Sequence, residues 1–468
     1  MRRTRIVCTI GPSSSTPTVL KAMVVAGMDA ARFNFSHGDA DSHRRNAALV
    51  RGAASATGRT VALIGDLQGP KIRTGPLDSA LVRLTRGQKV ALVTERTGSN
   101  QLEITVSHRE LVEALKPRDR VLVDDGQIEL KVSSTNGTRA ECVVTRGGLL
   151  GERKGISVPG RPLSMPAITD KDRDDIRLAV ELRLDYLALS FVRHPGDVMQ
   201  CRAALDELNS RMPVIAKLEK FESIRNAEAI MKVADGVMVA RGDLGVELKL
   251  GEVPAVQKDV IYRANRAGVP VITATEMLES MVTSNRPTRA EASDVANAIW
   301  DGTDAVMLSQ ETSVGAHPVD SVRAMARICN AAERHPIFLR QRPIWAEPGE
   351  VGSAIAHAAA ASADELGARA IIAFTESGTT ALRCSKAHPK VLVIAASPHA
   401  EVLRKTCLYS GVTPLLVSPG NDTDAMIANA TQAAAKSGLV RRGDRVVVVA
   451  GVPVGQPGQT NLLKIEIV

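Results

Sequence analysis

The feature that most constrains the fold is a series of eight short apolar segments, each followed by polar residues and most separated by helical patterns. Short apolar segments that alternate with helices are typical of buried parallel strands. Eight such units predict an α/β protein built on a closed (β/α)₈ TIM barrel. The predicted strands are Arg5–Ile10, Ala30–Asn34, Val61–Asp66, Asp185–Ser190, Pro213–Leu218, Gly236–Ala240, Pro270–Ala274 and Asp304–Ser309. The predicted helices include Asp170–Leu184, Asp197–Leu208, Ser223–Val233, Val253–Ala267 and Arg289–Asp301.

A long interval between the third and fourth predicted strands breaks this alternation. It has the period-two pattern of exposed strands and many turn residues, for example in Val121–Gly126 and Lys154–Gly160. We therefore expect an inserted all-β domain at residues 71–166, with the barrel at residues 1–70 and 167–340. An insertion in a loop after a barrel strand lies on the catalytic face, where it can act as a lid.

The last part of the chain predicts a separate α/β domain at residues 341–468. After Pro343–Pro348, an alanine-rich helical pattern begins near Gly352. Four further apolar strands are expected at Ala370–Phe374, Val391–Ala395, Thr413–Val417 and Arg445–Ala450.

Composition argues against several functional classes. Aromatic residues make up only 2% of the chain, too few for the stacking platforms of single-stranded nucleic-acid binding. The net charge of +8 comes without a basic block, so it fits an arginine-rich surface or a field that attracts anionic substrates, and not a DNA-binding tract. The six cysteines form no C-x-x-C motif, which favours reduced thiols in the cytoplasm. Neither a signal peptide nor an apolar membrane-spanning segment is expected.

Polar residues gather where the predicted barrel strands end. Because the carboxyl ends of barrel strands meet at one face, where barrel active sites are built, this pattern predicts a single site. The residues at these ends are Arg32, Asn34, Ser36, Asp66, Lys217, Glu219, Arg241, Asp243, Thr275, Glu276, Ser309 and Glu311.

Lys217 and Glu219 stand two residues apart, so a strand presents both side chains on one face. Alone they would indicate only an ion pair at a strand end. Asp243, after the neighbouring strand, adds a second carboxylate, and two carboxylates in one cleft need a positive partner. Two oxygen ligands with room for water and phosphate suit Mg²⁺ or Mn²⁺, which leaves Lys217 to neutralise charge on a transferring group. Gly242 indicates either a tight turn or backbone N–H groups presented to a carboxylate.

Six motifs resemble those of the pyruvate kinase family, in order and over nearly the whole chain. They are residues 6–12 (IVCTIGP), 31–38 (ARFNFSHG), 69–75 (GPKIRTG), 240–245 (ARGDLG), 276–280 (EMLES) and 286–291 (RPTRAE). The resemblance implies a barrel with a lid and a C-terminal regulatory domain. It also implies the last step of glycolysis, in which phosphoenolpyruvate and ADP give pyruvate and ATP.

The resemblance assigns roles to individual residues. Arg32 and Lys217 would offset the charge of the phosphoryl group, with Thr275 beside the reacting carbon. Glu219 and Asp243 match the metal ligands, and the backbone at Gly242–Asp243 would hold the substrate carboxylate. The residues that match positions near the nucleotide are Arg73, His37, Pro70, Asp125 and Lys154.

One departure from the family concerns the monovalent cation. Many members hold K⁺ with residues that match Asn34, Ser36, Asp66 and the carbonyl of Leu67, and they carry glutamate where this chain has Lys71. An ammonium group near the cleft can supply the positive charge of K⁺. The sequence therefore predicts K⁺-independent activity, and the alternative is a solvated lysine at a domain hinge.

A loop in the C-terminal domain is the expected effector site. Hydroxyl groups at a helix N-terminus can bind phosphate, and the family binds phosphorylated effectors there. Whether the effector is a sugar monophosphate, fructose 1,6-bisphosphate or AMP is open, as is an ordinary capped turn, because Glu376 would repel phosphate. The loop residues are Thr375, Ser377, Gly378, Thr379 and Thr380. The resemblance also implies a homotetramer.

Two other functional classes are compatible with parts of this pattern. One is a different metal-dependent barrel enzyme that acts on phosphoenolpyruvate or an enolate, such as a lyase. The other is a catalytically inactive sensor of phosphometabolites, which we would expect to lack Lys217, Glu219 or Asp243; all three are present.

Overall fold

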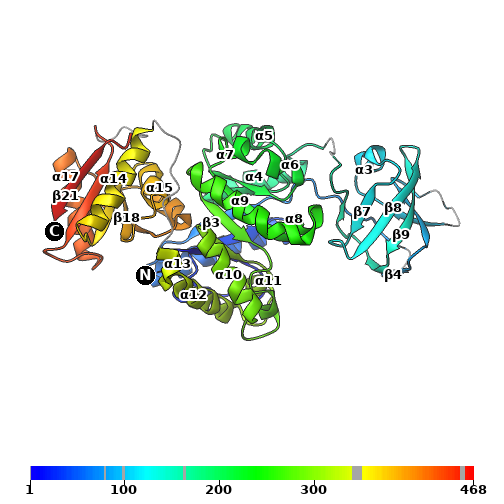
Figure 1. Ribbon diagram of the computed structural model, residues 1–468, viewed down its shortest axis with the longest axis horizontal. Helices are drawn as coiled ribbons and strands as arrows, with labels where there is room; N and C mark the ends of the chain where they lie inside the picture. Colours follow the sequence, from blue (N-terminus) through cyan, green and yellow to red (C-terminus); the bar gives the residue numbers. More distant parts are fainter. Residues whose placement is uncertain are drawn as a thin grey trace.

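The computed structural model describes residues 2–77, 81–96, 98, 101–161, 165–339, 350–453 and 459–468. In these residues the helix-covered barrel lies centrally, with the inserted strands at one end of the molecule and the C-terminal sheet at the other (Figure 1). The expected boundary at residues 340–341 and the segment Pro343–Pro348 lie outside the described residues. None of the described helices has the length and apolar character that crossing a membrane requires.

Eight parallel strands close into a barrel in the order β1-β2-β3-β12-β13-β14-β15-β16, which confirms the predicted barrel. Strands β3 and β12 are direct neighbours, with Ile64 opposite Tyr186, although the inserted strands separate them in sequence. The barrel strands are β1 (Arg5–Thr9), β2 (Ala30–Asn34), β3 (Ala62–Asp66), β12 (Tyr186–Leu189), β13 (Val214–Leu218), β14 (Gly236–Ala240), β15 (Val271–Ala274) and β16 (Ala305–Leu308).

The barrel strands are buried on both faces, which explains why they are continuously apolar in sequence. Along β3, Leu63 belongs to the hydrophobic cluster shared with the surrounding helices, whereas Ala62 and Ile64 belong to the cluster inside the barrel. The strict alternation follows from the period of two in a strand.

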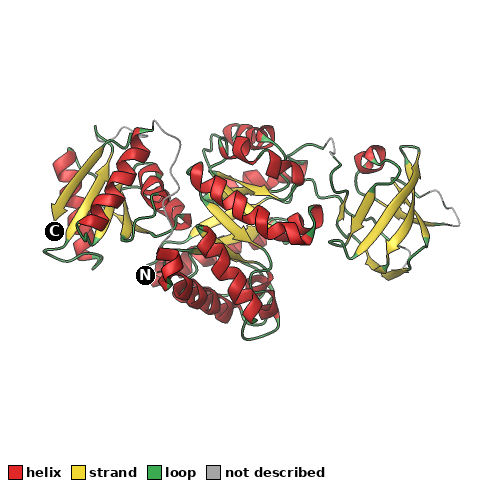
Figure 2. Ribbon diagram, viewed as in Figure 1, coloured by secondary structure: helices red, strands yellow, loops and turns green. Residues whose placement is uncertain are grey.

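Helices cover the outside of the barrel (Figure 2). One prediction was wrong in detail: the helix expected at Ser223–Val233 is two short helices that meet at Asn226. The Asn226 side chain donates to the carbonyl of Arg193 at 2.8 Å, and its backbone leaves the helical conformation there. The helices of this part are α1 (Pro17–Ala26), α2 (Ala40–Thr57), α4 (Asp170–Glu181), α5 (Pro195–Asp206), α6 (Phe221–Arg225), α7 (Ala227–Met231), α8 (Arg241–Glu247), η1 (Leu250–Glu252), α9 (Val253–Arg266), η2 (Glu279–Val282), α10 (Arg289–Asp301), α11 (Gln310–Ser313), α12 (Pro318–Arg334) and α13 (Pro336–Leu339).

The inserted residues form a six-stranded sheet in the order β11-β7-β8-β9-β5-β6 and a two-stranded sheet, β10-β4, around a hydrophobic cluster of their own. A short helix, α3 (Arg109–Ala114), was not predicted. The expected limits of this domain, residues 71 and 166, remain a prediction. The strands are β4 (Leu81–Leu84), β5 (Lys89–Val93), β6 (Leu102–Thr105), β7 (Arg120–Val123), β8 (Ile128–Thr135), β9 (Arg139–Arg146), β10 (Gly148–Gly151) and β11 (Ile156–Ser157).

The C-terminal part contains a five-stranded sheet in the order β19-β18-β17-β20-β21. Four of its strands were predicted; the edge strand β21 was not, because it is largely exposed and pairs antiparallel to β20. The elements are α14 (Val351–Glu365), β17 (Ala370–Phe374), α15 (Thr379–Lys386), β18 (Leu392–Ser397), α16 (Ala400–Lys405), η3 (Thr406–Leu408), β19 (Val412–Leu416), α17 (Thr423–Lys436), β20 (Arg445–Ala450) and β21 (Leu462–Ile467).

Buried polar contacts join the C-terminal part to the amino-terminal end of the barrel. The Lys386 ammonium lies 2.6 Å from Asp304, which precedes β16, and donates to Asn265 at 2.8 Å. Arg404 donates to Asp185, which precedes β12, at 2.7 Å. The carboxyl ends of the barrel strands therefore face away from this interface.

We expect Lys386→Ala to lower the thermal unfolding midpoint clearly, because it leaves the buried Asp304 carboxylate without its cation. Breaking a buried pair by removing one partner typically costs about 3–5 kcal/mol. The matched control is Arg323→Ala, which removes the solvent-exposed pair with Asp320 on α12 and is expected to have little effect. Equal midpoints for the two variants, measured by differential scanning calorimetry, would show that the buried pair does not stabilise the interface.

Candidate active site

A buried carboxylate, Asp66, joins two cations at the carboxyl end of the barrel. Its Oδ2 atom accepts a hydrogen bond from Arg32 Nε at 2.6 Å, and its Oδ1 atom lies 3.2 Å from Lys217 Nζ. Although burial opposes it, the charges of Arg32 and Lys217 hold the pKa of Asp66 below its ordinary value. Although Asp66 is only 1% exposed, the two cations keep it ionised.

The Lys217 ammonium has two further partners. It donates to Ser190 Oγ at 2.7 Å and forms an ion pair with Glu219 Oε1 at 2.9 Å. Ser190 in turn donates to the carbonyl of Leu67 at 2.7 Å. Burial alone would lower the pKa of Lys217, but Asp66 and Glu219 outweigh it and raise the pKa above its ordinary value. Lys217 is therefore a fixed positive charge.

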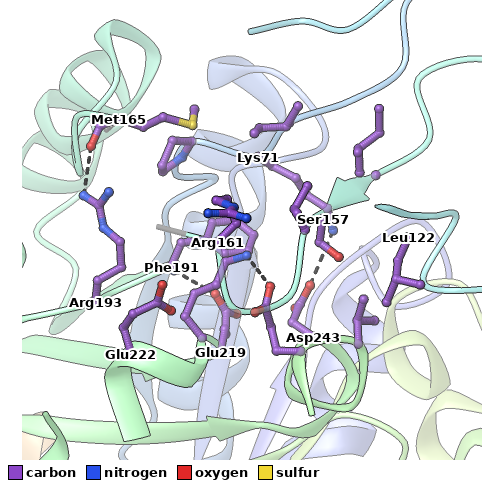
Figure 3. Close-up of a pocket in the computed structure, with 18 of the residues that line it drawn as sticks. Lys71, Leu122, Ser157, Arg161, Met165, Phe191, Arg193, Glu219, Glu222 and Asp243 are labelled. Atoms are coloured by element: carbon purple, nitrogen blue, oxygen red, sulfur yellow. Dashed lines mark hydrogen bonds and ion pairs between the residues drawn. The ribbon is translucent and has the colours of Figure 1, made fainter. Parts of the chain in front are cut away.

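Glu219 and Asp243 line one pocket between the barrel and the inserted strands (Figure 3). The backbone N–H of Phe191 donates to Glu219 Oε2 at 2.7 Å, while the buried Oε1 faces the Lys217 ammonium at 2.9 Å. Burial raises the pKa of Glu219, and the charge of Asp243 adds to this effect against the opposing Lys217. On the other side of the pocket, Lys71 Nζ lies 3.7 Å from Asp243 Oδ1.

These two carboxylates fit a divalent cation that substrate oxygens and water also ligate. The described residues contain no cluster of three or more acidic, histidine or cysteine side chains that could hold a metal alone. The mutual repulsion of these two carboxylates, one of them fully buried, is the feature that a Mg²⁺ or Mn²⁺ ion would relieve.

The residues after β14 and β15 are held together by Arg241. Thr275 and Glu276 have positive φ angles of 67° and 54°, a backbone conformation that non-glycine residues rarely adopt. The Arg241 guanidinium donates to the carbonyl of Thr275 at 2.7 Å and to that of Glu276 at 3.2 Å, and it pairs with Asp294 at 2.6 Å. Strained backbone of this kind persists only where surrounding contacts hold it.

Gly242 and Asp243 lie in the first turn of α8 and not in a glycine turn, so that interpretation of the sequence was wrong. The Gly242 N–H donates to Thr275 Oγ1 at 2.7 Å. A methyl group at Gly242 would lie 3.5 Å from this hydroxyl, which is an ordinary contact. Neither space nor backbone angle explains the glycine at this position.

Comparison with known families identifies the family to which this fold belongs. The family model described as "Pyruvate kinase, barrel domain" matches residues 1–322, and the model described as "Pyruvate kinase, alpha/beta domain" matches residues 353–466. The chain belongs to the pyruvate kinase family. It is therefore a phosphotransferase, as the motifs in the sequence implied.

Relatives and a solved structure agree over the full length. A pyruvate kinase of Mycobacterium tuberculosis is 44% identical over 465 residues, covering 99% of this chain and 98% of the relative. One from Corynebacterium glutamicum is 43% identical over 466 residues, covering 100% and 98%. The crystal structure of a pyruvate kinase from Cryptosporidium parvum superposes with a TM-score of 0.92 at 38% identity, covering 100% of this chain and 96% of that one.

Pyruvate kinases act on phosphoenolpyruvate and ADP. Of the five residues expected near the nucleotide, the structure brings only two to the pocket. Pro70 and Asp125 line the pocket that contains Glu219 and Asp243. Arg73, His37 and Lys154 do not line it. Arg73 donates to the carbonyl of Arg153 at 3.1 Å, and Lys154 pairs with Asp124 at 3.0 Å, both within the inserted domain.

The residues that match the K⁺ ligands of other pyruvate kinases are engaged with the protein itself. Asn34 Oδ1 accepts the N–H of Ser36 at 3.1 Å. Both oxygens of Asp66 face cations, and the carbonyl of Leu67 accepts the Ser190 hydroxyl. Lys71 pairs with Asp243, as described above, and makes no ion pair with Asp66 in the described part of the chain.

In the loop expected to bind an effector, the polar groups contact one another. Ser377 and Thr379 hydroxyls are 2.9 Å apart, and the N–H of Gly378 donates to Thr375 Oγ1 at 2.9 Å. Glu376 pairs with His399 at 2.9 Å. The Thr380 hydroxyl lies 3.0 Å from that of Thr460. The buried ammonium of Lys386, at the far end of α15, contacts the barrel and cannot reach this loop.

Sequence reasoning missed the residues that support the site from outside. Ser190 links Lys217 to the Leu67 carbonyl, and the Phe191 N–H fixes Glu219. Ser190 is the last residue of the fourth predicted barrel strand. The strand-end rule that selected the other site residues could therefore have selected Ser190 as well. Glu311, by contrast, was among the predicted strand-end residues. It is fully buried, and its carboxylate accepts the N–H groups of Ser309 and Leu278 at 2.6 and 3.0 Å, which anchors the last two loops.

We expect Asp66→Asn to lower turnover by about a hundredfold, because Arg32 and Lys217 lose the charge that orients them, and misplacement by about 1 Å can cost this much. The control is Asp174→Asn, which disrupts only an exposed ion pair with Arg177 on α4. Steady-state kinetics on both variants provides the measurement. Turnover of Asp66→Asn within twofold of the unaltered enzyme would contradict this role.

Proposed function

We propose that this chain catalyses phosphoryl transfer from phosphoenolpyruvate to ADP with Arg32 and Lys217 as its cationic groups and Glu219 and Asp243 as its metal ligands. The observation that carries the proposal is that Lys217 is fixed by Asp66 and Ser190 directly beside Glu219. A phosphoryl group in transfer spreads negative charge over its equatorial oxygens, so preorganised cations stabilise the transition state more than the ground state.

Each group contributes a distinct part of this chemistry. Lys217, buried and positively charged, offsets charge on the transferring group, and Arg32 is positioned for the same phosphate by its bond to Asp66. A divalent metal bound by Glu219 and Asp243 would supply further positive charge to the substrate oxygens. The backbone of Gly242–Asp243, at the start of α8, would hold the substrate carboxylate once Thr275 Oγ1 releases the Gly242 N–H.

Transfer leaves the enolate of pyruvate, which must be protonated at carbon. Thr275 is the hydroxyl placed for this step: it follows β15, and its strained backbone is fixed by Arg241. We propose that it orients a water that passes a proton from bulk solvent to the enolate carbon, so that no hydroxide is left in the site. Pro70, Asp125, Arg73, His37 and Lys154 would bind the nucleotide, the last three after the inserted domain closes on the barrel.

Lys217→Met is expected to reduce turnover about a hundredfold or more while phosphoenolpyruvate binding is largely retained. Loss of one charge-stabilising group typically costs about 3 kcal/mol in the transition state. Coupled assays give turnover, and equilibrium titration gives substrate affinity. The control is Lys232→Met, an exposed lysine that follows α7. Near-normal turnover of the Lys217 variant would refute the proposed role.

We further propose that activity does not depend on K⁺. Two of the four matching positions, Asp66 and the Leu67 carbonyl, already contact Arg32, Lys217 and Ser190. Lys71 adds an ammonium group at the other side of the site. This arrangement supplies local positive charge without a bound monovalent cation.

In potassium-free buffer we expect full activity from the unaltered enzyme and reduced activity from Lys71→Glu, with K⁺ restoring part of the loss in the variant. Lys131→Glu, on an exposed face of β8, controls for the change in charge. A many-fold rise in activity of the unaltered enzyme on addition of K⁺ would overturn the proposal.

Regulation by a phosphorylated metabolite at Thr375–Thr380 is also proposed. The hydroxyls of Ser377 and Thr379 at the start of α15 support it. Glu376 is the opposing charge, and its pair with His399 offsets it. A homotetramer and a cytoplasmic location belong to the same proposal; the six cysteines are all free and buried, which suits a reducing compartment.

The second candidate is another metal-dependent barrel enzyme acting on phosphoenolpyruvate, such as a lyase. The strand-end residues alone would allow it. The inserted domain and the match of both family models favour the kinase reaction.

A further inference from the structure

A second cleft lies in the C-terminal part, at the opposite end of the sheet from the loop Thr375–Thr380. Its volume is about 760 Å³, within the range of small-molecule sites. The loops that lead into β17, β18 and β20 form it together with the residues that precede β1. The lining residues are Arg2, Arg3, Leu366, Gly367, Ala368, Arg369, Lys390, Val391, Leu392, Gly411, Gly438, Leu439, Gly443, Asp444 and Arg445.

The charge of this cleft is strongly one-sided. Its lining contains five cationic side chains and one carboxylate, that of Asp444. Asp444 Oδ2 already accepts the N–H of Arg441 at 2.8 Å. Two of the cations have partners outside the lining: Arg2 pairs with Asp29, and Lys390 pairs with Asp364 at 3.1 Å.

The other three cations, Arg3, Arg369 and Arg445, have no carboxylate within ion-pair distance among the described residues. The Arg3 guanidinium donates to the carbonyl of Val391 at 3.4 Å, while its backbone N–H donates to Glu333 Oε2 at 2.8 Å. The Arg445 guanidinium donates to the carbonyl of Leu366 at 3.3 Å. Arg3 is the most enclosed of the three, and burial lowers the pKa of its guanidinium. The charges of Glu333 and Asp364 oppose this effect from beyond ion-pair distance. An enclosed cation without an ion-pair partner is costly, so an anion in the cleft would be stabilising.

We propose that this cleft binds a small phosphate-bearing anion through Arg3, Arg369 and Arg445. One guanidinium group can donate two parallel hydrogen bonds to two phosphate oxygens. Three guanidinium groups around one cavity therefore suit a dianionic group. Val391, Leu392 and Leu439 give part of the wall an apolar surface that can accept an organic group attached to the phosphate.

The position of the cleft links the bound anion to the junction of two parts of the molecule. Arg3 precedes β1 of the barrel, and its carbonyl accepts the N–H of Gly411 in the C-terminal part at 3.0 Å. Arg369 immediately precedes β17 and Arg445 begins β20, and these two strands are paired neighbours. An anion shared by the three side chains would therefore hold the chain start against the C-terminal sheet and stabilise this junction.

Equilibrium dialysis of the full-length chain with radiolabelled inorganic pyrophosphate, without added metal, tests the proposal. The site variant is Arg369→Glu/Arg445→Glu, which changes two exposed side chains. The control, Lys436→Glu/Lys464→Glu, makes the same change in net charge at exposed residues of the same domain that do not line the cleft. A third variant, Thr379→Glu, separates this cleft from the loop before α15.

We expect the site variant to bind pyrophosphate at one site fewer, or at least tenfold more weakly at one site, with unchanged turnover on phosphoenolpyruvate and ADP. The control and Thr379→Glu should retain that site. A parallel titration with ribose 5-phosphate identifies the source of the phosphate, since tighter binding of the ester than of pyrophosphate indicates an organic phosphate. Equal binding by the site variant and the unaltered chain would overturn the proposal, as would an equal loss in the control.

Discussion

The active-site end of this enzyme depends on one buried carboxylate. Asp66 stands at the end of β3 and contacts Arg32 from β2 and Lys217 from β13. Charges removed from water are tolerated only when they are paired with good geometry. The three side chains come from separate strands, so they meet only in the closed barrel, where Asn34 lies opposite Asp66 and Arg32 opposite Ile64. The ion pairs of the site therefore form only when the barrel is closed, and the buried charges are tolerated only because these pairs form.

The charges around Asp66 are balanced, which explains why the site suits a metal and an anionic substrate together. Arg32, Lys217 and Lys71 are matched by Asp66, Glu219 and Asp243. A divalent cation added to this balanced set gives the site a net positive charge that a phosphate dianion can neutralise. The C-terminal part contacts the barrel at Asp304 and Asp185, before the strands begin, and so leaves this end open to substrates.

The barrel could be predicted from sequence because every one of its strands is buried on both faces and is followed by polar residues. The pairing within the site could not. That Asp66 joins Arg32 to Lys217 depends on strand register across the barrel. The division of a helix at Asn226 depends on a tertiary contact with Arg193. Strand β21 was missed because its residues are largely exposed at a sheet edge, where the apolar signal is weak.

The measurement that tests this account most directly is the formation of ATP from phosphoenolpyruvate and ADP by the purified chain, followed by phosphorus NMR with and without Mg²⁺. The account predicts ATP and pyruvate in equal amounts when the metal is present, loss of the reaction when it is chelated, and loss in Glu219→Gln at any Mg²⁺ concentration that sustains the unaltered enzyme. Consumption of phosphoenolpyruvate without ATP, or full activity of Glu219→Gln, would contradict it.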